Sequence, residues 1–324
     1  MRTIVLSGLI VSAAVMTVPA YADLTVAQGS PSESAAEYRA TNIAPAASAR
    51  ALPFAAPAPI MTGILPPSLA PHVAPVAASP ILIAKLEVSP TPVMHGASPW
   101  GKILSTYIAA DGDLNRFDYG GLSGNAADMK SLDGYIQKLA GKTPSRMDKN
   151  EALAYWANLY NALTVQVVAK NWPVKSIKEI KSGVFKPGPW NLELVTVEGR
   201  SMSLNDIEHG TMRATWDEPR IHYMVNCASI GCPNLMLSPW KAETLEADLD
   251  AAAKAFVNSS RGAKVSGDNL TVSSIFKWYK KDFGGNDAGI ITHLKQYASG
   301  DLKSALDGVS KISKDQYDWN VNAK

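Results

Sequence analysis

The chain has 324 residues, of which 46% are hydrophobic and 19% are charged, and its formal net charge is +2. This balance argues against a nucleic-acid-binding surface, which is normally strongly basic, so no nucleic-acid partner is expected. Two cysteines exclude a scaffold with several disulfides and a zinc site made of four cysteines. The length predicts one large domain with additional segments, or two domains.

The first 22 residues have the pattern of an export signal. Arg2 supplies a positive charge at the start, residues 4–18 are mostly apolar, and residues 20–22 (Ala-Tyr-Ala) fit a small-x-small cleavage motif before Asp23. A short membrane anchor is the alternative, but the apolar run is short for one. We therefore predict an exported protein, periplasmic or extracellular, with no transmembrane segment after signal cleavage.

Residues 23–99 differ sharply in composition from the rest of the chain. They contain 13 of the 21 prolines and none of the eight tryptophans. Prolines interrupt helices, and a segment with so few large apolar side chains cannot bury a core. We predict a flexible, low-complexity Ala/Pro-rich linker. The alternative is a docking segment for a partner, in which residues 80–88 (PILIAKLEV) add as a strand to a sheet edge.

Residues 100–324 are then a single globular domain, long enough to bury a sizeable core. Its helices and strands are predicted from hydrophobic periodicity and from capping residues. Because they alternate irregularly, we predict the α+β class, with a short, mainly antiparallel sheet, a buried central helix and surrounding helices. The predicted helices are 123–141, 148–171, 203–213, 245–256, 274–283 and 287–298. The predicted strands are hairpins at 191–204 and 265–272, a strand at 220–226 and a strand-like segment at 316–321.

The helix at 148–171 is apolar almost all round, which predicts that it lies in the core. Asn158 and Asn161 are three residues apart and share one of its faces. Buried amides need hydrogen-bond partners, because an unpaired buried polar group costs about 1–3 kcal/mol. We expect both to hold the backbone of a neighbouring loop; alternatively they hold the loop of Cys227 or bind a substrate carbonyl.

The segment at 220–235, RIHYMVNCASIGCPNL, contains His222 and both cysteines of the chain. A thiol and an imidazole close in sequence are typical of a cysteine nucleophile that is activated by a base. An extended backbone, at about 3.3 Å per residue, would separate His222 from Cys227 by about 16 Å. A catalytic dyad therefore requires a bend, or a base from elsewhere in the chain.

Four interpretations of Cys227 and Cys232 are open at this point. A disulfide fits an oxidising compartment and the length of the loop. Two buried thiols would act as small hydrophobic side chains. Together with His222, the two cysteines would supply three zinc ligands, although no fourth ligand is evident. The last interpretation is a catalytic thiolate. We expect no metal and no cofactor.

Glu208 shares an apolar face with Leu204 in SLNDIEHGTMR (203–213). Such a carboxylate is expected to be part-buried and paired with a cation, with Arg213, Arg220 or a histidine as the candidates. Its role is a structural ion pair or, alternatively, the orientation of His222 behind a base. In a strand at 220–226, alternate residues would face the core, which leaves His222 on the other face. We therefore predict that His222, Cys227 and Glu208 converge on one partly accessible pocket.

Five separated motifs together resemble the family catalogued as domain of unknown function 547. They are YWANLYNALTVQVV, SLNDIEHGTMR, RIHYMVNCASIGCPNL, SIFKWYKKDF and YDWNVN, and the resemblance covers about residues 100–324. The resemblance implies no established activity. A looser likeness, of fold alone, is to papain- and transglutaminase-like enzymes, which also have a buried helix followed by strands. The positions that match the family motifs are Asn158, Tyr160, Asn161, Glu208, Arg213, His222, Cys227 and Cys232.

Two functions are compatible with these residues. The first is an exported envelope domain that binds a small molecule or a peptide in a pocket formed by His222, Cys227 and Glu208. The second is a thiol-dependent hydrolase or acyl transferase, with Cys227 as nucleophile, His222 as base and Glu208 orienting His222. The further residues expected to line the pocket are Asn158, Tyr160, Asn161, Arg213, Asn226 and Ser229.

Overall fold

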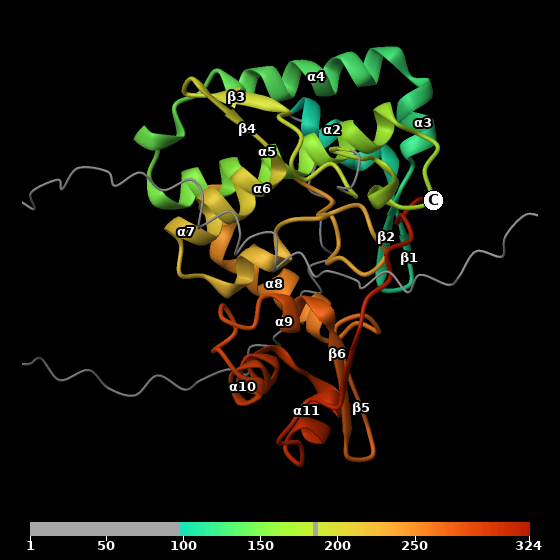
Figure 1. Ribbon diagram of the computed structural model, residues 1–324, viewed down its shortest axis with the longest axis vertical. Helices are drawn as coiled ribbons and strands as arrows, with labels where there is room; N and C mark the ends of the chain where they lie inside the picture. The colour runs from blue at the N-terminus through green and yellow to red at the C-terminus, as the bar shows by residue number, and fades with distance from the viewer. Residues whose placement is uncertain (1–97, 184–186) are drawn as a thin grey trace, which may run out of the picture.

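The computed structural model describes residues 98–183 and 187–324 (Figure 1). The predicted export signal, nearly all of the Ala/Pro-rich segment and the strand proposed at 80–88 lie outside these residues. Among the helices of the described chain, none combines the length and the apolar character that a bilayer-spanning helix requires.

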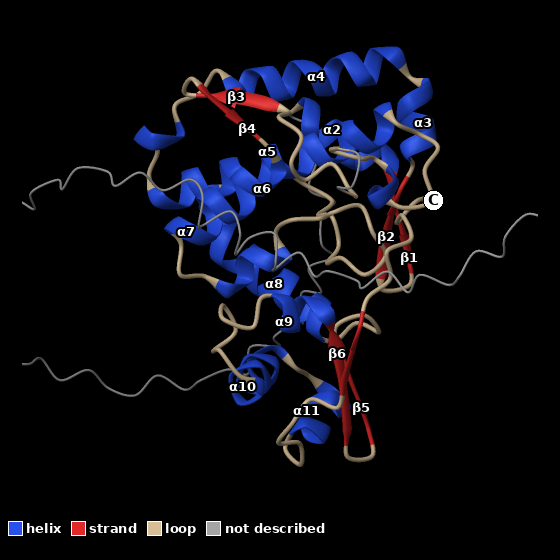
Figure 2. Ribbon diagram, viewed as in Figure 1, coloured by secondary structure: helices blue, strands red, loops and turns tan. Residues whose placement is uncertain are grey.

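Helices dominate the described chain, and its strands form three small, separate sheets (Figure 2). The predicted α+β class is therefore confirmed. The α-helices are α2 (Pro99–Tyr107), α3 (Tyr119–Gly124), α4 (Ala126–Ala140), α5 (Lys149–Lys170), α6 (Leu204–Ile207), α7 (Arg213–Thr215), α8 (Leu245–Val257), α9 (Ser274–Trp278), α10 (Asp287–Tyr297) and α11 (Gly300–Leu306). A π-helical turn at Glu208–Met212 joins α6 to α7, and short 3-10 helices lie at Pro144–Arg146, Ile177–Glu179, Pro219–Tyr223 and Ala242–Thr244.

The strands pair mostly with their neighbours in sequence, and all but one pair are antiparallel. The antiparallel pairs are β1 (Ile108–Asp111) with β2 (Leu114–Phe117), β3 (Val195–Val197) with β4 (Arg200–Met202), and β5 (Ala263–Ser266) with β6 (Asn269–Ser273). The exception is β7 (Lys314–Gln316), which adds to β6 in parallel. The sheet order β5-β6-β7 thus brings the C-terminal part of the chain back beside the β5–β6 hairpin.

Helix α5 is the buried central helix that the sequence predicts. The Asp148 side chain caps it by accepting a hydrogen bond from the Glu151 N–H, and every residue from Ala152 to Val165 is buried. It packs against α3, α4 and α6 in the first of two hydrophobic clusters. The second cluster is formed by α8, α10 and the β5–β6 hairpin, at the opposite end of the molecule from α4 (Figure 1).

The predicted hairpins and caps are largely confirmed. Glu198 and Gly199 form the turn between β3 and β4, and both have positive φ angles. Ser203 and Asp206 form the expected capping box of α6. The helix predicted to start with Ser274 as its cap is instead capped by Ser273, and it ends at Trp278 rather than near residue 283.

The strand predicted at 220–226 is wrong, because Pro219–Tyr223 is a 3-10 helix. Pro219 has the backbone angle of a helix start, and the Glu218 side chain accepts a hydrogen bond from the Arg220 N–H at 2.9 Å. These local interactions outweigh the β propensity of the following residues. The predicted alternation of faces fails with the strand, because every residue from Ile221 to Asn226 is buried.

The chain ends in an extended segment that runs beside the loop of the two cysteines. The Ile230 N–H donates to the Asn320 carbonyl at 2.8 Å, and the Gly231 N–H donates to the Asp318 carbonyl at 2.9 Å. Hydrogen bonds between backbones hold the two segments in a fixed register. The register places Tyr317, at the start of this segment, next to the cysteines.

Candidate functional site

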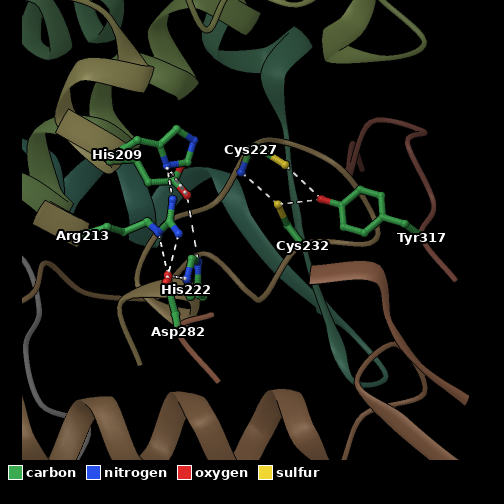
Figure 3. A network of polar contacts seen from close by, with 8 residues as sticks. His209, Arg213, His222, Cys227, Cys232, Asp282 and Tyr317 are labelled. Carbon is green, nitrogen blue, oxygen red and sulfur yellow. Dashed lines mark hydrogen bonds and ion pairs between the residues drawn. The ribbon is translucent and has the colours of Figure 1, made fainter. Parts of the chain in front are cut away.

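His222 lies in a group of charged side chains, Glu208, His209, Arg213, His222 and Asp282, which we call the acid–histidine cluster (Figure 3). The His222 Nε2 is 2.7 Å from Asp282 Oδ2, and its Nδ1 is 4.0 Å from Glu208 Oε1. The residue is only 2% exposed. Both ring nitrogens of His222 therefore face carboxylates inside the protein.

Asp282 is the main partner of Arg213. Arg213 donates from Nε to Oδ2 at 2.6 Å and from Nη2 to Oδ1 at 3.0 Å, the bidentate arrangement of a strong ion pair. Burial opposes the ionisation of Asp282, but hydrogen bonds from His222 and Arg213 outweigh it and hold the pKa of this carboxyl well below its usual range. Of the cations expected for Glu208, the structure therefore brings up a histidine and not Arg213: Glu208 Oε1 lies 3.7 Å from His209 Nδ1.

The two cysteines lie in a second group, which we call the thiol cluster (Cys227, Ser229, Cys232 and Tyr317). Both are free thiols in near contact, so a disulfide between them stays a prediction. The Tyr317 hydroxyl is 3.0 Å from Cys227 Sγ and 3.1 Å from Cys232 Sγ. The Cys227 backbone N–H donates to Cys232 Sγ at 3.0 Å, and the fully buried Ser229 hydroxyl is 3.0 Å from Cys227 Sγ.

The two thiols differ in exposure and in acidity. Cys227 is half-buried, whereas Cys232 is 4% exposed. Burial raises the pKa of the Cys227 thiol, and the neighbouring Cys232 raises it further. Burial also opposes ionisation of Cys232, but hydrogen bonds from Cys227 and Tyr317 outweigh it and lower its pKa to about 7. The inner thiol is therefore the more acidic one.

Tyr160 and Tyr279 connect the two clusters. The Tyr279 ring stacks on His222, with the ring centroids 4.1 Å apart. Burial raises the pKa of the Tyr160 hydroxyl, and the charges of Glu208, Cys227 and Cys232 raise it further. The Tyr160 hydroxyl therefore lies within electrostatic reach of both clusters, which are neighbours in Figure 3.

His222 and Cys227 nevertheless belong to different groups of contacts. In the described chain, the hydrogen bonds of the Cys227 sulfur go to Ser229 and Tyr317 and not to His222. The structure therefore joins Glu208 to His222 and places Cys227 in the neighbouring cluster. A pocket shared by all three remains a prediction.

Two buried polar groups in this region make no hydrogen bond within the described chain. They are the Tyr160 hydroxyl and the Glu208 carboxylate, in residues that are 1% and 6% exposed. The contacts of Glu208 are the two imidazoles, at 3.7 Å and 4.0 Å. Other buried side-chain atoms, such as Thr164 Oγ1 and Trp240 Nε1, also make no hydrogen bond in the described chain. Glu208 and Tyr160 differ from these because they lie beside the acid–histidine cluster, where an unpaired carboxylate and hydroxyl are candidates to bind a ligand.

The two asparagines of α5 hold two different loops. Asn161 donates from Nδ2 to the Met224 carbonyl at 2.8 Å and accepts from the Asn226 N–H at 2.9 Å. Asn158 makes the same pair of bonds with the backbone of Trp240, at 2.9 Å and 3.0 Å. The expectation that both amides hold the backbone of a neighbouring loop is therefore confirmed. The alternative, that they hold the segment leading to Cys227, applies to Asn161 and is wrong for Asn158.

Asn226 and Arg261 shape the loop between the cysteines. Asn226 donates from Nδ2 to the Pro233 carbonyl at 2.7 Å and accepts from the Ala228 N–H at 2.8 Å. The second bond closes a tight turn in which Ala228 has a φ of 59°, a left-handed angle that is uncommon for alanine. Arg261 donates to the Cys232 carbonyl from the other side of the loop.

Two hollows of the structure lie away from both clusters. One, of about 590 Å³, is lined by the β5-β6-β7 sheet, and the other, of about 360 Å³, lies along β3. Within residues 98–183 and 187–324, no group of three His, Cys, Asp or Glu side chains is arranged to hold a metal ion.

Sequence analysis missed Tyr279, Asp282 and Tyr317. Tyr279 and Asp282 lie in the motif SIFKWYKKDF, and Tyr317 is the first residue of YDWNVN. Both motifs contribute to the family resemblance, but nothing in them indicates which side chain faces the site. Asp282 is 60 positions from His222, and Tyr317 is 90 positions from Cys227, so local patterns cannot pair them.

A family model described as "Protein of unknown function, DUF547" matches residues 144–257. Over these residues, 114 of the 324 in the chain, the sequence is similar to that family. The match confirms the resemblance and contains α5, Glu208, His222 and both cysteines. The motifs with Asp282 and Tyr317 follow the matched DUF547 segment, so these two residues of the site lie outside the matched residues. None of the curated proteins and none of the solved structures matches the chain, so the papain- or transglutaminase-like fold stays a prediction.

Proposed function

We propose that this chain is an exported domain that binds a small molecule or a peptide at Glu208 and Tyr160. The observation that carries the proposal is the buried Glu208 carboxylate, which accepts no hydrogen bond from the described chain. Burying a charged group is costly unless a donor reaches it. Export is supported by the apolar segment and the cleavage motif in residues 1–22.

The ligand that fits these two groups carries an N–H donor close to an acceptor. The donor would bind the Glu208 carboxylate, and the acceptor would receive the Tyr160 hydroxyl hydrogen. A peptide unit or an amino acid has both groups in one short stretch. Arg213, Cys227 and Tyr279 are part-exposed. Burial raises the pKa of both the Tyr160 and the Tyr279 hydroxyls, and the charges of Glu208 and Cys227 raise it further, so these side chains lie within electrostatic reach of one another.

The contacts of His222 favour binding over the thiol-dependent hydrolase or acyl transferase. That reaction needs His222 to take the proton of Cys227. The His222 Nε2 is held by Asp282 at 2.7 Å, and its Nδ1 faces Glu208 at 4.0 Å. An imidazole between two carboxylates, with no contact to the thiol, is poorly placed to act as that base.

Binding is tested by isothermal titration calorimetry of the chain from Asp23 to Lys324 with free amino acids, dipeptides and tripeptides of varied charge. Glu208→Gln keeps the shape of the side chain but removes its charge, and it should weaken binding about tenfold or more, since hydrogen bonds to charged groups are the stronger ones. Glu193→Gln is the matched control, because Glu193 is exposed and its side chain bonds only Ser201 among the described residues.

Affinity that is the same in Glu208→Gln and in the unchanged protein would contradict the proposal, as would the absence of binding across the whole set. Hydrolysis of a p-nitrophenyl ester that is lost in both Cys227→Ser and His222→Gln would support the hydrolase instead. Circular dichroism shows whether each variant is folded.

Export is tested separately: N-terminal sequencing of the exported protein should find Asp23 as its first residue.

A further inference from the structure

We propose that Cys227 and Cys232 form a reversible disulfide that exchanges with small-molecule or peptide thiols, with Cys227 as the attacked sulfur and Cys232 as the leaving group. The proposal goes beyond ligand binding and does not depend on Glu208 or Tyr160. It differs from a structural disulfide because the contacts around the sulfurs favour the reduced state.

The fold holds the two sulfurs close to each other as free thiols. Both contact the Tyr317 hydroxyl, at 3.0 Å and 3.1 Å. The loop between them is tied on one side to the C-terminal segment through Ile230 and Gly231, and on the other side to Arg261. Such fixed placement raises the effective concentration of one thiol at the other.

Exposure decides which sulfur an external thiol reaches. Cys227 is half-buried, whereas Cys232 is only 4% exposed. Thiol–disulfide exchange requires the attacking sulfur to approach the sulfur that it will bond. An incoming thiolate therefore attacks the Cys227 sulfur, and the Cys232 sulfur is the leaving group.

The surroundings of Cys232 stabilise the charge that develops when it leaves. The Cys227 N–H donates to Cys232 Sγ at 3.0 Å, and the Tyr317 hydroxyl lies at 3.1 Å. Burial opposes ionisation of the Cys232 thiol, but hydrogen bonds from the Cys227 thiol, and then from the Tyr317 hydroxyl and the Cys227 N–H, lower its pKa to about 7. A more acidic leaving thiol departs faster, and a stabilised reduced state makes the disulfide a stronger oxidant.

The exchange balances in two steps. A thiolate RS⁻ attacks Cys227 Sγ, the Cys227–Cys232 bond breaks, Cys232 leaves as a thiolate, and RS–S–Cys227 forms. A second thiolate then attacks the R sulfur, which gives RS–SR and releases Cys227 as a thiolate that takes up a proton. Two external thiols are oxidised to one disulfide, and the protein disulfide is reduced to two thiols. A small-molecule disulfide returns the protein to its oxidised form by the reverse steps.

The equilibrium is measured in buffers with varied ratios of reduced to oxidised glutathione, followed by acid quenching, alkylation and mass spectrometry. Tyr317→Phe removes one donor to Cys232 and should make the disulfide about tenfold harder to reduce, as expected for a hydrogen bond to a charged sulfur. Tyr135→Phe is the matched control, since Tyr135 stacks on Trp100 and should keep the unchanged equilibrium constant.

Two further variants test the direction of attack and remain decisive if Tyr317→Phe does not fold. With oxidised glutathione, Cys232→Ser should accumulate a mixed disulfide at Cys227, whereas Cys227→Ser should accumulate almost none at the buried Cys232. The proposal is overturned if the unchanged protein forms no Cys227–Cys232 bond, if Cys232 is glutathionylated as fast as Cys227, or if a folded Tyr317→Phe has an equilibrium constant within twofold of the unchanged one.

Discussion

Replacing Asn161 with leucine should lower the free energy of unfolding by about 4 kcal/mol. Asn161 is 2% exposed, and its amide holds the Met224 carbonyl and the Asn226 N–H at 2.8 Å and 2.9 Å. Leucine has a similar size but strands both backbone groups, each at a cost of about 1–3 kcal/mol. Urea denaturation of the reduced protein, followed by circular dichroism, measures the loss.

Asn158→Leu is the matched control for this change. It strands the N–H and the carbonyl of Trp240 in the same way and should cost a similar free energy. Only Asn161→Leu should also alter the rate at which iodoacetamide alkylates Cys227, because Asn161 holds the residues that lead into Cys227. A loss below about 1 kcal/mol for Asn161→Leu would show that the two backbone groups find other partners, and it would contradict the prediction.

Acidification from pH 6.5 to pH 4 should destabilise the protein by about 3 kcal/mol through His293 alone. Burial lowers the pKa of His293 from 6.5 to about 4. The folded protein keeps this ring neutral, whereas the unfolded chain takes up a proton below its ordinary pKa. The contribution of His293 to stability is therefore complete above pH 6.5 and is lost as the pH falls toward 4.

The prediction is checked by measuring the free energy of unfolding at several pH values in the unchanged protein and in His293→Gln. The variant should show a shallower fall between pH 6.5 and 4, although burial also lowers the pKa of His209, which contributes to the remaining slope. Tyr223→Phe is the control, because it removes the 2.7 Å hydrogen bond to His293 but keeps the titrating ring. Parallel curves for the unchanged protein and His293→Gln would refute the assignment.

The sequence by itself determined those features that depend on neighbouring residues. The apolar pattern and Asp148 predicted α5, and Ser203 with Asp206 predicted the start of α6. The turn at Glu198-Gly199 and the burial of Asn161 were also predictable. Capping, periodicity and turn chemistry act over a few residues, so the sequence contains all that they require.

The same kind of local pattern gave a wrong prediction at residues 219–226. The β-rich composition favoured a strand, but Pro219 and the Glu218 cap start a 3-10 helix, and the segment is buried on all sides between α5 and α8. A strand with one exposed face is recognised by its alternating apolar and polar residues. A segment that is buried on two sides lacks this alternation. The direction in which the His222 ring points is therefore set by the packing of this segment between α5 and α8, and strand alternation could not predict it.

Only the tertiary structure decided which groups meet at the site. Asp282 approaches His222 from 60 positions away, and Tyr317 reaches both thiols because the C-terminal segment pairs with the cysteine loop. The sequence singled out Cys227 as the nucleophile, but the structure makes Cys232 the more acidic thiol. Acidity depends on burial and on donors contributed by distant segments, and neither is defined until the chain has folded.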